Sequence, residues 1–406
     1  MKIACIIFAP MGKMGGAQVF AFNLLGKLNE FGHDVTLYLT DCSYKDLQGK
    51  IKNCPFRIKP LFFETARISL YVPFLMRQII KGIQKREKYD LWQVIGAYPA
   101  GYVASVLSGK APLVLRTHGE DIQKNHELNY GARLNSAKEK KIRETLNTMD
   151  RLVAMTRNMY DCYAELQVPP EKIVEIPNAV NLKRFSISND RTATRHRYNM
   201  SGEKTLLVTV GRYHVKKGHD LIPEIADSLR QRHIDFKWLL IGNGLENLRK
   251  EINQKGLSDY IILKEEIGMT DMFGEQGEIN IPNDELIELL KCSDIFVFPT
   301  RLEGFPMVLI EAMAAGIPVV TTNSPGVREI VAHNKTALLS EIDDVDSMAS
   351  NIIRLIKDYD LRNNLVRESR KELSKYDRDN VANQYVKLYT QLVNKNKARK
   401  NRDLFA

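Results

Sequence analysis

The chain has 406 residues, which exceeds one ordinary hydrophobic core and suits two domains of about 150–200 residues each. It is 44% hydrophobic and 27% charged, as in most globular proteins, and no apolar run approaches the ~20 residues that would span a bilayer. The net charge is +10, and residues 1–180 carry most of it, with 25 Lys and Arg against 17 Asp and Glu, which predicts an anionic partner other than nucleic acid.

The cysteines and the first residues indicate a compartment. Five cysteines, an odd number without a C-x-x-C pair, are typical of a reducing environment and argue against a zinc site. The N-terminus has one lysine and a short apolar run before glycines, which does not match a secretory signal peptide. We therefore expect a cytoplasmic protein, with a peripheral position at the inner face of a membrane as an extension of that expectation.

In the first half, short β-branched apolar runs alternate with stretches of helical periodicity. Such alternation predicts βαβ units, because parallel strands need a crossover connection, usually a helix, between them. The predicted strands are 2–9, 35–40, 56–63, 91–95, 113–117, 151–155 and 173–176, with a helix over 17–31.

A polar stretch without periodicity, 181–203, is interpreted as an interdomain linker, after which the alternation restarts. The fold class is therefore α/β, with two Rossmann-like doubly wound parallel-sheet domains, 1–180 and 204–375, facing a cleft. Residues 376–406 predict a C-terminal helix and basic tail that pack back on the N-terminal domain. The predicted strands of the second half are 205–211, 236–241, 260–263, 294–299 and 318–321, and its helices are 218–231, 245–255, 284–292, 306–315, 343–357 and 380–393.

The loop after the first strand contains glycines at positions 12, 15 and 16. In a parallel α/β domain this loop lies at the carboxyl edge of the sheet, where glycines let backbone N–H groups approach an anion. The pattern is G-x-x-G-G and not the dinucleotide fingerprint G-x-G-x-x-G, so a tight turn without a ligand is an alternative. Asp41, after the second strand, could hold a ribose in a nicotinamide oxidoreductase.

The second half opens with a strand that runs into Gly211-Arg212, and a helix starts near Gly218. Arg212 and Lys217 therefore flank the carboxyl end of a strand and the amino end of the next helix. Two cations in this place suit a diphosphate, because Arg can bind two oxygens at once and Lys acts as a point charge. Solvated surface cations are the alternative.

The most informative block is 298–316. A strand ends before a loop that contains Glu303, and Pro306 suits the first turn of a helix that is apolar on nearly every side. Glu311 lies within this helix, where an unpartnered carboxylate would be costly and where ribose hydroxyls would satisfy it. Glu303 could accept hydrogen bonds from a sugar. The alternative for Glu311 is a structural carboxylate bonded to backbone amides.

These motifs resemble the retaining glycosyltransferases of the GT-B fold, family four. The specific part is E-G-F-P-x-x-x-x-E-A-M-A-x-G-x-P-V-V from Glu303, together with G-R-x-x-x-x-K-G from Gly211. Further matches follow the family's order, so the resemblance spans nearly the whole chain. They are Gly15-Gly16, Thr117-His118-Gly119 and Ile176-Pro177-Asn178.

The resemblance implies a donor site for a nucleotide-diphosphate sugar. Arg212 and Lys217 would hold the phosphates, Glu311 the ribose, and Glu303 the transferred sugar. The backbone of Gly304 and Phe305 would line the site. The donor-binding candidates are Gly15, Gly16, Arg212, Lys217, Glu303, Gly304, Phe305, Pro306 and Glu311.

The resemblance also implies the reaction. His118 would contact the transferred sugar near the reaction centre, although a histidine at a strand end is otherwise more often a capping or packed residue. The anomeric configuration would be retained without a metal or cofactor, and the leaving diphosphate would accept the acceptor's proton. The catalytic candidates are His118, Arg212, Lys217 and Glu303. Asp121 is a weaker candidate.

A rival design, the GT-A fold, holds a metal with a D-x-D motif. The D-x-D triplets here, 344–346, 358–360 and 377–379, fall at predicted helix boundaries, where aspartates cap helices, and we interpret them as structural. The chain departs from the family at 266–282, an acidic, glycine-bearing insertion near the expected site of the nucleotide base. The identity of the base therefore stays open.

Residues 72–88 predict an amphipathic basic helix. A core helix with a solvated basic face explains the pattern, and so does a face that meets anionic lipid. The surplus charge of the first half favours a lipid-linked or membrane-proximal acceptor. The apolar stripe is Val72, Leu75, Met76, Ile79, Ile80 and Ile83, and the basic one is Arg77, Lys81, Lys85 and Lys88.

We therefore predict a glycosyltransferase of the hexosyltransferase class that moves a sugar from a UDP- or GDP-sugar to a glycan or lipid-linked acceptor. The expected context is bacterial-type polysaccharide, lipopolysaccharide or glycolipid biosynthesis. The alternatives are an epimerase or hydrolase of nucleotide sugars with the same fold, and, further away, the nicotinamide oxidoreductase.

Overall fold

The computed structural model describes residues 1–11, 15–61, 72–200, 202, 204–265, 267 and 272–405. For residues 72, 73 and 403–405 only the backbone is described. Part of the first glycine loop, residues 12–14, and part of the expected insertion, residues 266 and 268–271, lie outside this range. The side chain of Val72, expected on the apolar stripe, lies outside it as well.

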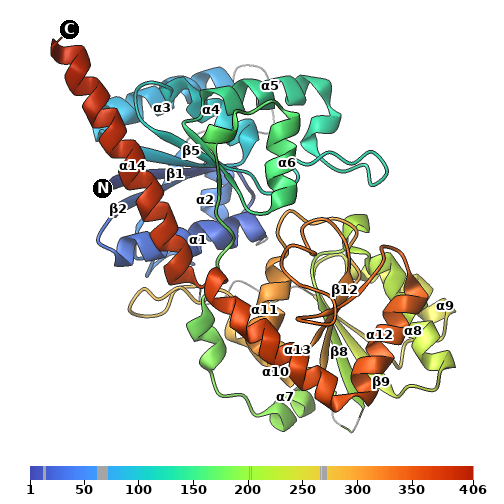
Figure 1. Cartoon of the computed structure of the whole chain (residues 1–406). Helices are drawn as coiled ribbons and strands as arrows, with labels where there is room; N and C mark the ends of the chain where they lie inside the picture. The colour runs from blue at the N-terminus through green and yellow to red at the C-terminus, as the bar shows by residue number, and fades with distance from the viewer. Residues whose placement is uncertain are drawn as a thin grey trace. The chain divides into compact units, whose positions relative to one another are not determined.

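The chain divides into two compact units, each described here by itself (Figure 1). The first unit consists of Met1–Ala179, Thr270–Ile281 and Arg378–Ala406. The second consists of Val180–Met269 and Pro282–Asp377. Both units are α/β, with wholly parallel sheets, as the sequence predicts.

The first unit has a seven-stranded sheet in the order β3-β2-β1-β4-β5-β6-β7, with helices over both faces (Figure 1). All five residues Ile3–Ile7 of β1 are buried, as expected of a strand covered on both sides. The strands are β1 Lys2–Ile7, β2 Asp34–Thr40, β3 Arg57–Leu61, β4 Leu91–Ile95, β5 Leu113–Arg116, β6 Arg151–Ala154 and β7 Ile173–Glu175. The helices are α1 Gly16–Glu30, α2 Asp41–Leu47, α3 Val72–Glu87, α4 Tyr102–Ala104, α5 Ser136–Thr148, α6 Arg157–Glu165 and α14 Arg378–Phe405.

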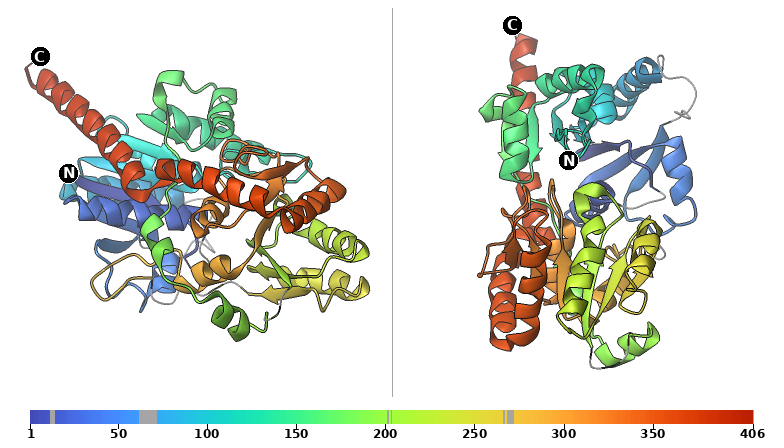
Figure 2. Two further views of the ribbon diagram at one scale, coloured as in Figure 1. Left: turned by 60° about the horizontal axis from the view of Figure 1, so that its bottom comes forward. Right: turned by 90° about the vertical axis from the view of Figure 1, so that its right-hand side faces the viewer.

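The last helix of the chain, α14, belongs to this first unit, and its final turns extend past the neighbouring elements (Figure 2). It packs on α1, where Lys27 Nζ lies 2.9 Å from Asp379 Oδ1. Arg116, fully buried at the end of β5, donates 2.7 Å to the Tyr385 hydroxyl of α14 and also bonds Asn178. Neutral partners thus surround this guanidinium and fix α14 to the sheet.

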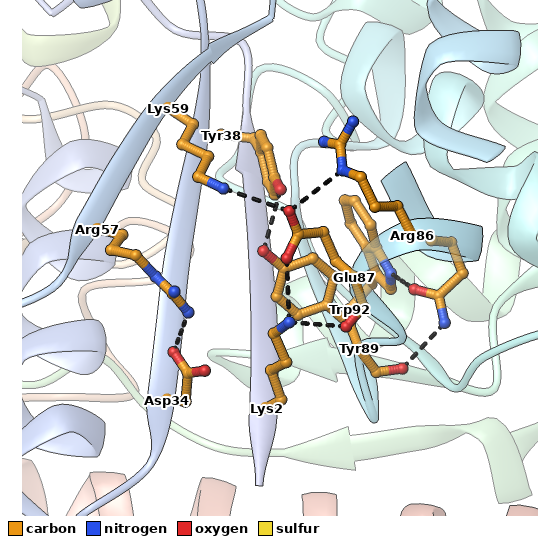
Figure 3. Close-up of polar contacts among 10 residues, drawn as sticks. Lys2, Asp34, Tyr38, Arg57, Lys59, Arg86, Glu87, Tyr89 and Trp92 are labelled. Atoms are coloured by element: carbon orange, nitrogen blue, oxygen red, sulfur yellow. Dashed lines mark hydrogen bonds and ion pairs between the residues drawn. The ribbon is translucent and has the colours of Figure 1, made fainter. Parts of the chain in front are cut away.

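A polar cluster at the opposite, amino edge of the sheet fixes the end of α3 (Figure 3). The Glu87 carboxylate accepts hydrogen bonds from Lys2, Lys59 and Arg86, at 3.0, 3.4 and 3.4 Å. The hydrogen bond from Lys2, followed by the charge of Lys59, lowers the pKa of Glu87 to about 2. Ion pairs therefore connect the last turn of α3 to β1 and β3.

The described part of the expected insertion forms a small hairpin of the first unit. Residues Phe273 and Ile279 pair as an antiparallel bridge, and Asn280 N donates 2.8 Å to Met272 O. The Phe273 ring packs edge-on against Phe22 of α1, with ring centroids 5.8 Å apart. This segment of the second half of the sequence therefore completes the core of the first unit.

The second unit has a six-stranded sheet in the order β10-β9-β8-β11-β12-β13. Its strands are β8 Thr205–Val210, β9 Phe236–Ile241, β10 Ile261–Lys264, β11 Ile295–Phe298, β12 Val319–Thr322 and β13 Leu338–Ser340. Its helices are α7 Arg191–Arg197, α8 Ile222–Gln231, α9 Arg249–Gln254, α10 Asp284–Cys292, α11 Met307–Ala315, α12 Val345–Lys357 and α13 Tyr359–Glu372. Across the described residues, no helix of either unit combines the length and apolarity needed to cross a membrane.

The segment 181–203, interpreted from the sequence as an interdomain linker, has regular structure of its own. It contains α7, which packs against α10 as part of the second unit. Arg191 and Arg195 of α7 both pair with Asp294, which precedes β11, and Arg197 lies 2.9 Å from Glu288. This polar helix is thus held by ion pairs and has no apolar stripe, which explains why the sequence shows no helical periodicity there.

Candidate functional site

The candidate residues of the second unit lie on two loops at the carboxyl end of its sheet. One loop, residues 211–219, follows β8, and the other, residues 299–306, follows β11. Gly218 has a φ of +66°, and a Cβ there would lie 1.8 Å from the Pro299 carbonyl oxygen. The carbonyl of Lys216 accepts hydrogen bonds from Thr300 Oγ1 at 2.8 Å and Arg301 N at 2.7 Å. The two loops are therefore locked together by backbone contact.

Lys217 and Glu303 form the central charged pair of these loops. Lys217 Nζ lies 2.6 Å from Glu303 Oε1, and Thr300 Oγ1 donates 3.0 Å to the same oxygen. Burial lowers the pKa of Lys217 below its ordinary value, although the Glu303 charge opposes this. Burial would raise the pKa of Glu303, but the charge of Lys217 outweighs it and the pKa lies below the ordinary value. The pairing therefore favours the ionised form of Glu303.

Arg212 stands at the start of the first loop and is exposed. The following residue, Tyr213, is fixed by a 2.7 Å hydrogen bond from its N–H to Asn243 O. Within the part of the chain that the structure describes, the Arg212 guanidinium has no ion pair. Its charge contributes to lowering the pKa of Lys217, which shows that the two cations act on each other. This loop therefore offers positive charge to an anion from outside.

Arg301 is a residue that the sequence analysis missed. Its guanidinium binds Asp220 with two hydrogen bonds of 2.8 and 2.7 Å and Asp343 with one of 2.6 Å. These bonds, that to Asp220 first, raise the pKa of Arg301. Arg301 thereby fastens the stretch that follows Lys217. The signal was an arginine beside Glu303, but its acidic partners are 81 and 42 residues away in sequence, so spacing could not reveal them.

Glu311 lies in the middle of α11 and is only 6% exposed. Burial raises the pKa of its carboxyl group to about 7. Among the residues with described positions, no side chain or backbone group bonds this carboxylate. The expected conflict between an acid and its apolar helix is therefore present in the fold. The alternative of a Glu311 bonded to backbone amides is not what the structure shows.

The loop between the two glutamates is buried. Gly304, Phe305 and Pro306 are all shielded, and Pro306 is the residue that precedes the first turn of α11. The Phe305 ring packs edge-on against Tyr376, with centroids 5.8 Å apart. This packing fixes the backbone of 304–305 at the amino end of a helix, where N–H groups and the helix dipole favour an anion.

Gly15 and Gly16, in the first unit, begin α1 at the carboxyl end of β1. Both are exposed, and a side chain at Gly16 would meet nothing within 4 Å. Internal packing therefore does not require glycine at position 16. Gln18 holds the turn from inside, with its Oε1 3.1 Å from Gly15 N and its Nε2 2.7 Å from Pro10 O.

His118 follows β5 in the first unit, and its ring lies 5.7 Å from that of Phe20 on α1. Its Nε2 is shielded and has no hydrogen-bond partner among the described groups. Burial, and then the charge of Arg116, lowers the pKa of His118 well below its ordinary value. The imidazole is therefore neutral at physiological pH.

Three of the acids considered as rivals have structural roles. Asp344 and Asp358 accept hydrogen bonds from Ser347 N and Leu361 N, at 2.9 and 2.8 Å, and so cap α12 and α13. Asp41, the ribose candidate of the nicotinamide interpretation, lies in the first turn of α2 and pairs with Lys45 at 2.8 Å.

Two parallel Rossmann-like domains with charged loops at the strand ends form the GT-B fold. The model of "Glycosyltransferase Family 4" matches residues 14–184, and that of "Glycosyl transferases group 1" matches residues 190–372. The chain belongs to glycosyltransferase family four, and it is an enzyme that uses a nucleotide-sugar donor. This assignment replaces the nicotinamide alternative.

Named relatives span nearly the full chain. An N-acetyl-alpha-D-glucosaminyl L-malate synthase of Bacillus anthracis is 24% identical over 93% of this chain and 94% of its own length. The phosphatidylinositol N-acetylglucosaminyltransferase GPI3 subunit of Saccharomyces cerevisiae is 24% identical over 97% of this chain and 83% of its own. The solved structure of Anabaena Alr3699/HepE in complex with UDP-glucose has a TM-score of 0.77 at 16% identity and covers 97% of this chain and 100% of its own.

Proposed function

We propose that this glycosyltransferase moves a hexose from a UDP- or GDP-sugar to a glycan or lipid-linked acceptor, with retention of anomeric configuration and without a metal. The context would be polysaccharide, lipopolysaccharide or glycolipid biosynthesis. The observation that carries the donor site is Glu311, a buried carboxylate of α11 that bonds none of the described residues. A pair of ribose hydroxyls is a neutral donor group that would satisfy it.

The cations of the second unit would hold the diphosphate. Arg212, exposed and without an ion pair in the described part of the chain, can bind two phosphate oxygens. Lys217 would exchange its contact with Glu303 for one with the phosphate, which leaves Glu303 to accept hydrogen bonds from sugar hydroxyls. As the bond from the sugar to the diphosphate breaks, charge grows on the leaving oxygens, and both cations stabilise it.

On the first unit, His118 would meet the transferred sugar. Because its pKa is lowered by burial, the ring is neutral and one nitrogen can accept a hydrogen bond while the other donates. A neutral ring also avoids repulsion from the Arg and Lys that hold the phosphates. Gly15 and Gly16 would bring backbone N–H groups to the same anion.

Metal-free catalysis is proposed because these cations supply the charge that a divalent ion supplies in the D-x-D design. Asp344 and Asp358, which a metal would need, are engaged in capping helices. We expect transfer activity to survive an excess of EDTA. A requirement for added Mg²⁺ or Mn²⁺ would contradict this part of the proposal.

The test of the donor and of the reaction begins with a thermal-shift screen of UDP-, GDP- and ADP-sugars. The stabilising donor is then incubated with glycan and lipid-linked acceptors, and the anomeric configuration of the product is read from its ¹H NMR coupling constant. Retention in a new glycoside supports the proposal. A free sugar or an epimerised nucleotide sugar, formed equally with and without acceptor, would instead establish the hydrolase or epimerase alternative.

We further propose that the enzyme acts in the cytoplasm at an anionic membrane surface, through the basic face of α3. Of the expected apolar stripe, Met76, Ile80 and Ile83 are buried. Leu75, on the same stripe, is 42% exposed, and Phe74 beside it is 61% exposed. Two exposed apolar side chains on a basic helix are what an interfacial helix needs.

Lysines of α14 add to this basic face. Lys85 of α3 and Lys88, which follows this helix, line one pocket together with Lys397 and Lys400 of α14. Each basic residue near an anionic surface contributes about 1 kcal/mol of binding. The yeast GPI3 relative is named as a phosphatidylinositol N-acetylglucosaminyltransferase subunit, and this lipid in its name supports a lipid-linked acceptor here.

Sedimentation with phosphatidylglycerol liposomes tests this surface. We expect binding at low salt that weakens as salt is added, and at least tenfold weaker binding for the Phe74→Ser, Leu75→Ser double variant. The Val215→Ser variant, which removes an exposed apolar side chain of the second unit, is the control. Equal binding of anionic and neutral liposomes, or no binding at low salt, would end the membrane proposal.

A further inference from the structure

An acidic side chain of the first unit lies directly beside His118, and the proposed reaction does not use it. Asp121, three residues after His118, accepts a 2.8 Å hydrogen bond from His118 N to its Oδ1. Its other oxygen, Oδ2, accepts a 2.7 Å hydrogen bond from Ala97 N. One carboxylate therefore joins the loop after β5 to the loop after β4.

The loop after β4 has a shape that needs such an anchor. Gly96 has a φ of +94°, and Tyr98, two residues later, has an extended backbone inside an otherwise helical turn. Gly101 N closes the turn with a 2.9 Å hydrogen bond to Gly96 O. Within this turn, the Asp121 carboxylate holds Ala97. The place of the half-buried Tyr98 side chain at the carboxyl edge of the sheet follows from it.

The electrostatic surroundings of Asp121 do not explain its burial. In the described structure its carboxylate has no ion pair. Burial raises its pKa to about 6, the amides of His118 and Ala97 oppose this, and Glu120 raises it further. Two further titratable residues lie near it: His118, from whose backbone N–H it accepts a hydrogen bond, and Tyr163, whose pKa is raised by the charge of Asp121. Burying a carboxylate without a cationic partner costs free energy, so we interpret its two backbone hydrogen bonds as the reason for its position.

We infer that Asp121 is a positioning residue of the transfer reaction, whose carboxylate fixes the backbone of His118 and the loop Gly96–Tyr98 as one rigid edge. The inference deepens the proposed function and rests on it. The ionised form is required, because only a carboxylate can accept from both N–H groups through two separate oxygens. Placement of a catalytic group to within about 1 Å is worth up to 100-fold in rate.

The informative change is Asp121→Asn, which has the same shape but turns an NH₂ group towards one of the two amides. We expect kcat per folded molecule to fall about 10- to 100-fold, with the donor KM within about twofold, because the donor phosphates and ribose are held by the second unit. The matched control is Glu120→Gln, which removes the neighbouring exposed carboxylate and should leave kcat unchanged. Melting temperatures of both variants report the folded fraction.

The pH profile separates positioning from a merely structural role. In the wild type, kcat should fall as the pH drops through about 6, because protonation of Asp121 removes one of its acceptor oxygens. In Asp121→Asn this acid limb should be absent and the rate low throughout. A variant with wild-type kcat, or one with the acid limb intact, overturns the inference.

A readout without turnover distinguishes failure of this inference from failure of the proposed function. In protein labelled with ¹⁵N at alanine and histidine, the amide resonances of Ala97 and His118 should titrate together near pH 6 and stay constant in Asp121→Asn. If the wild type transfers no sugar yet both amides titrate, the proposed function falls and the anchor stands. If neither amide titrates, the anchor itself is refuted.

Discussion

Replacing Glu311 by Gln tests the central claim that this carboxylate waits for a partner from outside the protein. The group is 6% exposed, and burial raises its pKa from 4.5 to about 7. A displacement of this size corresponds to about 3 kcal/mol of differential interaction between the two protonation states. The wild type therefore loses stability whenever Glu311 is forced to ionise inside the fold.

The direction of the pH effect follows from proton binding. Between pH 4.5 and about 7 the folded state holds more protons on Glu311 than the unfolded state does, so stability falls as the pH rises through this window. Gln has no charge to bury. Its stability relative to the wild type should rise by about 3 kcal/mol from pH 4.5 to pH 8, while its affinity for the nucleoside diphosphate falls.

Urea unfolding followed by tryptophan fluorescence measures this difference in stability for the second unit, which contains Glu311. The chain has two tryptophans, Trp92 in β4 of the first unit and Trp238 in β9 of the second. In a Trp92→Phe background, Trp238 reports only the second unit, which avoids assuming that both units unfold in one transition. Glu303→Gln is the matched control: because the pKa of Glu303 lies below 4.5, its difference from the wild type should stay nearly constant from pH 4.5 to pH 8 and change, with the opposite sign, only below pH 4.5.

A constant difference between Glu311→Gln and the wild type from pH 4.5 to pH 8 would refute the reasoning. It would mean that the carboxylate is satisfied within the protein. Ribose recognition by Glu311 would then lose its physical basis. A variant that gains stability at pH 8 and keeps full donor affinity would refute the ligand part alone.

Three further changes act on the loops of the second unit. Lys217→Ala should lower transfer activity by about 10²- to 10³-fold with the fold intact, as measured by initial rates and circular dichroism; a wild-type rate would contradict its role at the diphosphate. Gly218→Ala places a Cβ 1.8 Å from Pro299 O at a φ of +66°, so urea unfolding should show a loss of at least about 2 kcal/mol. Arg301→Ala frees the stretch that Asp220 anchors and should raise the donor KM about tenfold with a smaller change in kcat; an unchanged KM would limit Arg301 to a structural role.

Much of the fold was predictable because its signals are local. The runs 91–95 and 236–241 coincide with β4 and β9, and 284–292 coincides with α10, since buried parallel strands and amphipathic helices carry their period in a short window. The segment 181–203 carried no such period, because α7 is held by ion pairs to Asp294, about 100 residues away. Long-range charge pairing leaves no local pattern.

The candidate site divides in the same way. The burial of Glu311 agrees with the expectation drawn from its apolar helix, whereas the pairing of Lys217 with Glu303 was not predicted, because the two residues lie 86 positions apart in sequence. Arg301 and the bridging role of Asp121 were missed, because each depends on groups from another strand or helix. The exposure of Leu75 was not predictable, because a helical stripe shows which residues share a face, but not where the covering elements end.

The order in which the polypeptide is made has a bearing on how it folds. All seven strands of the first unit precede residue 180, yet its hairpin, with Phe273, and its closing helix α14 come much later. On the ribosome, Phe22 therefore lacks its edge-on neighbour Phe273 until the second half of the chain is well under way, and Arg116 lacks the Tyr385 hydroxyl until nearly the whole protein has emerged. The second unit is contiguous apart from this hairpin and ends at Asp377, so it can mature first, and the N-terminal sheet is sealed last.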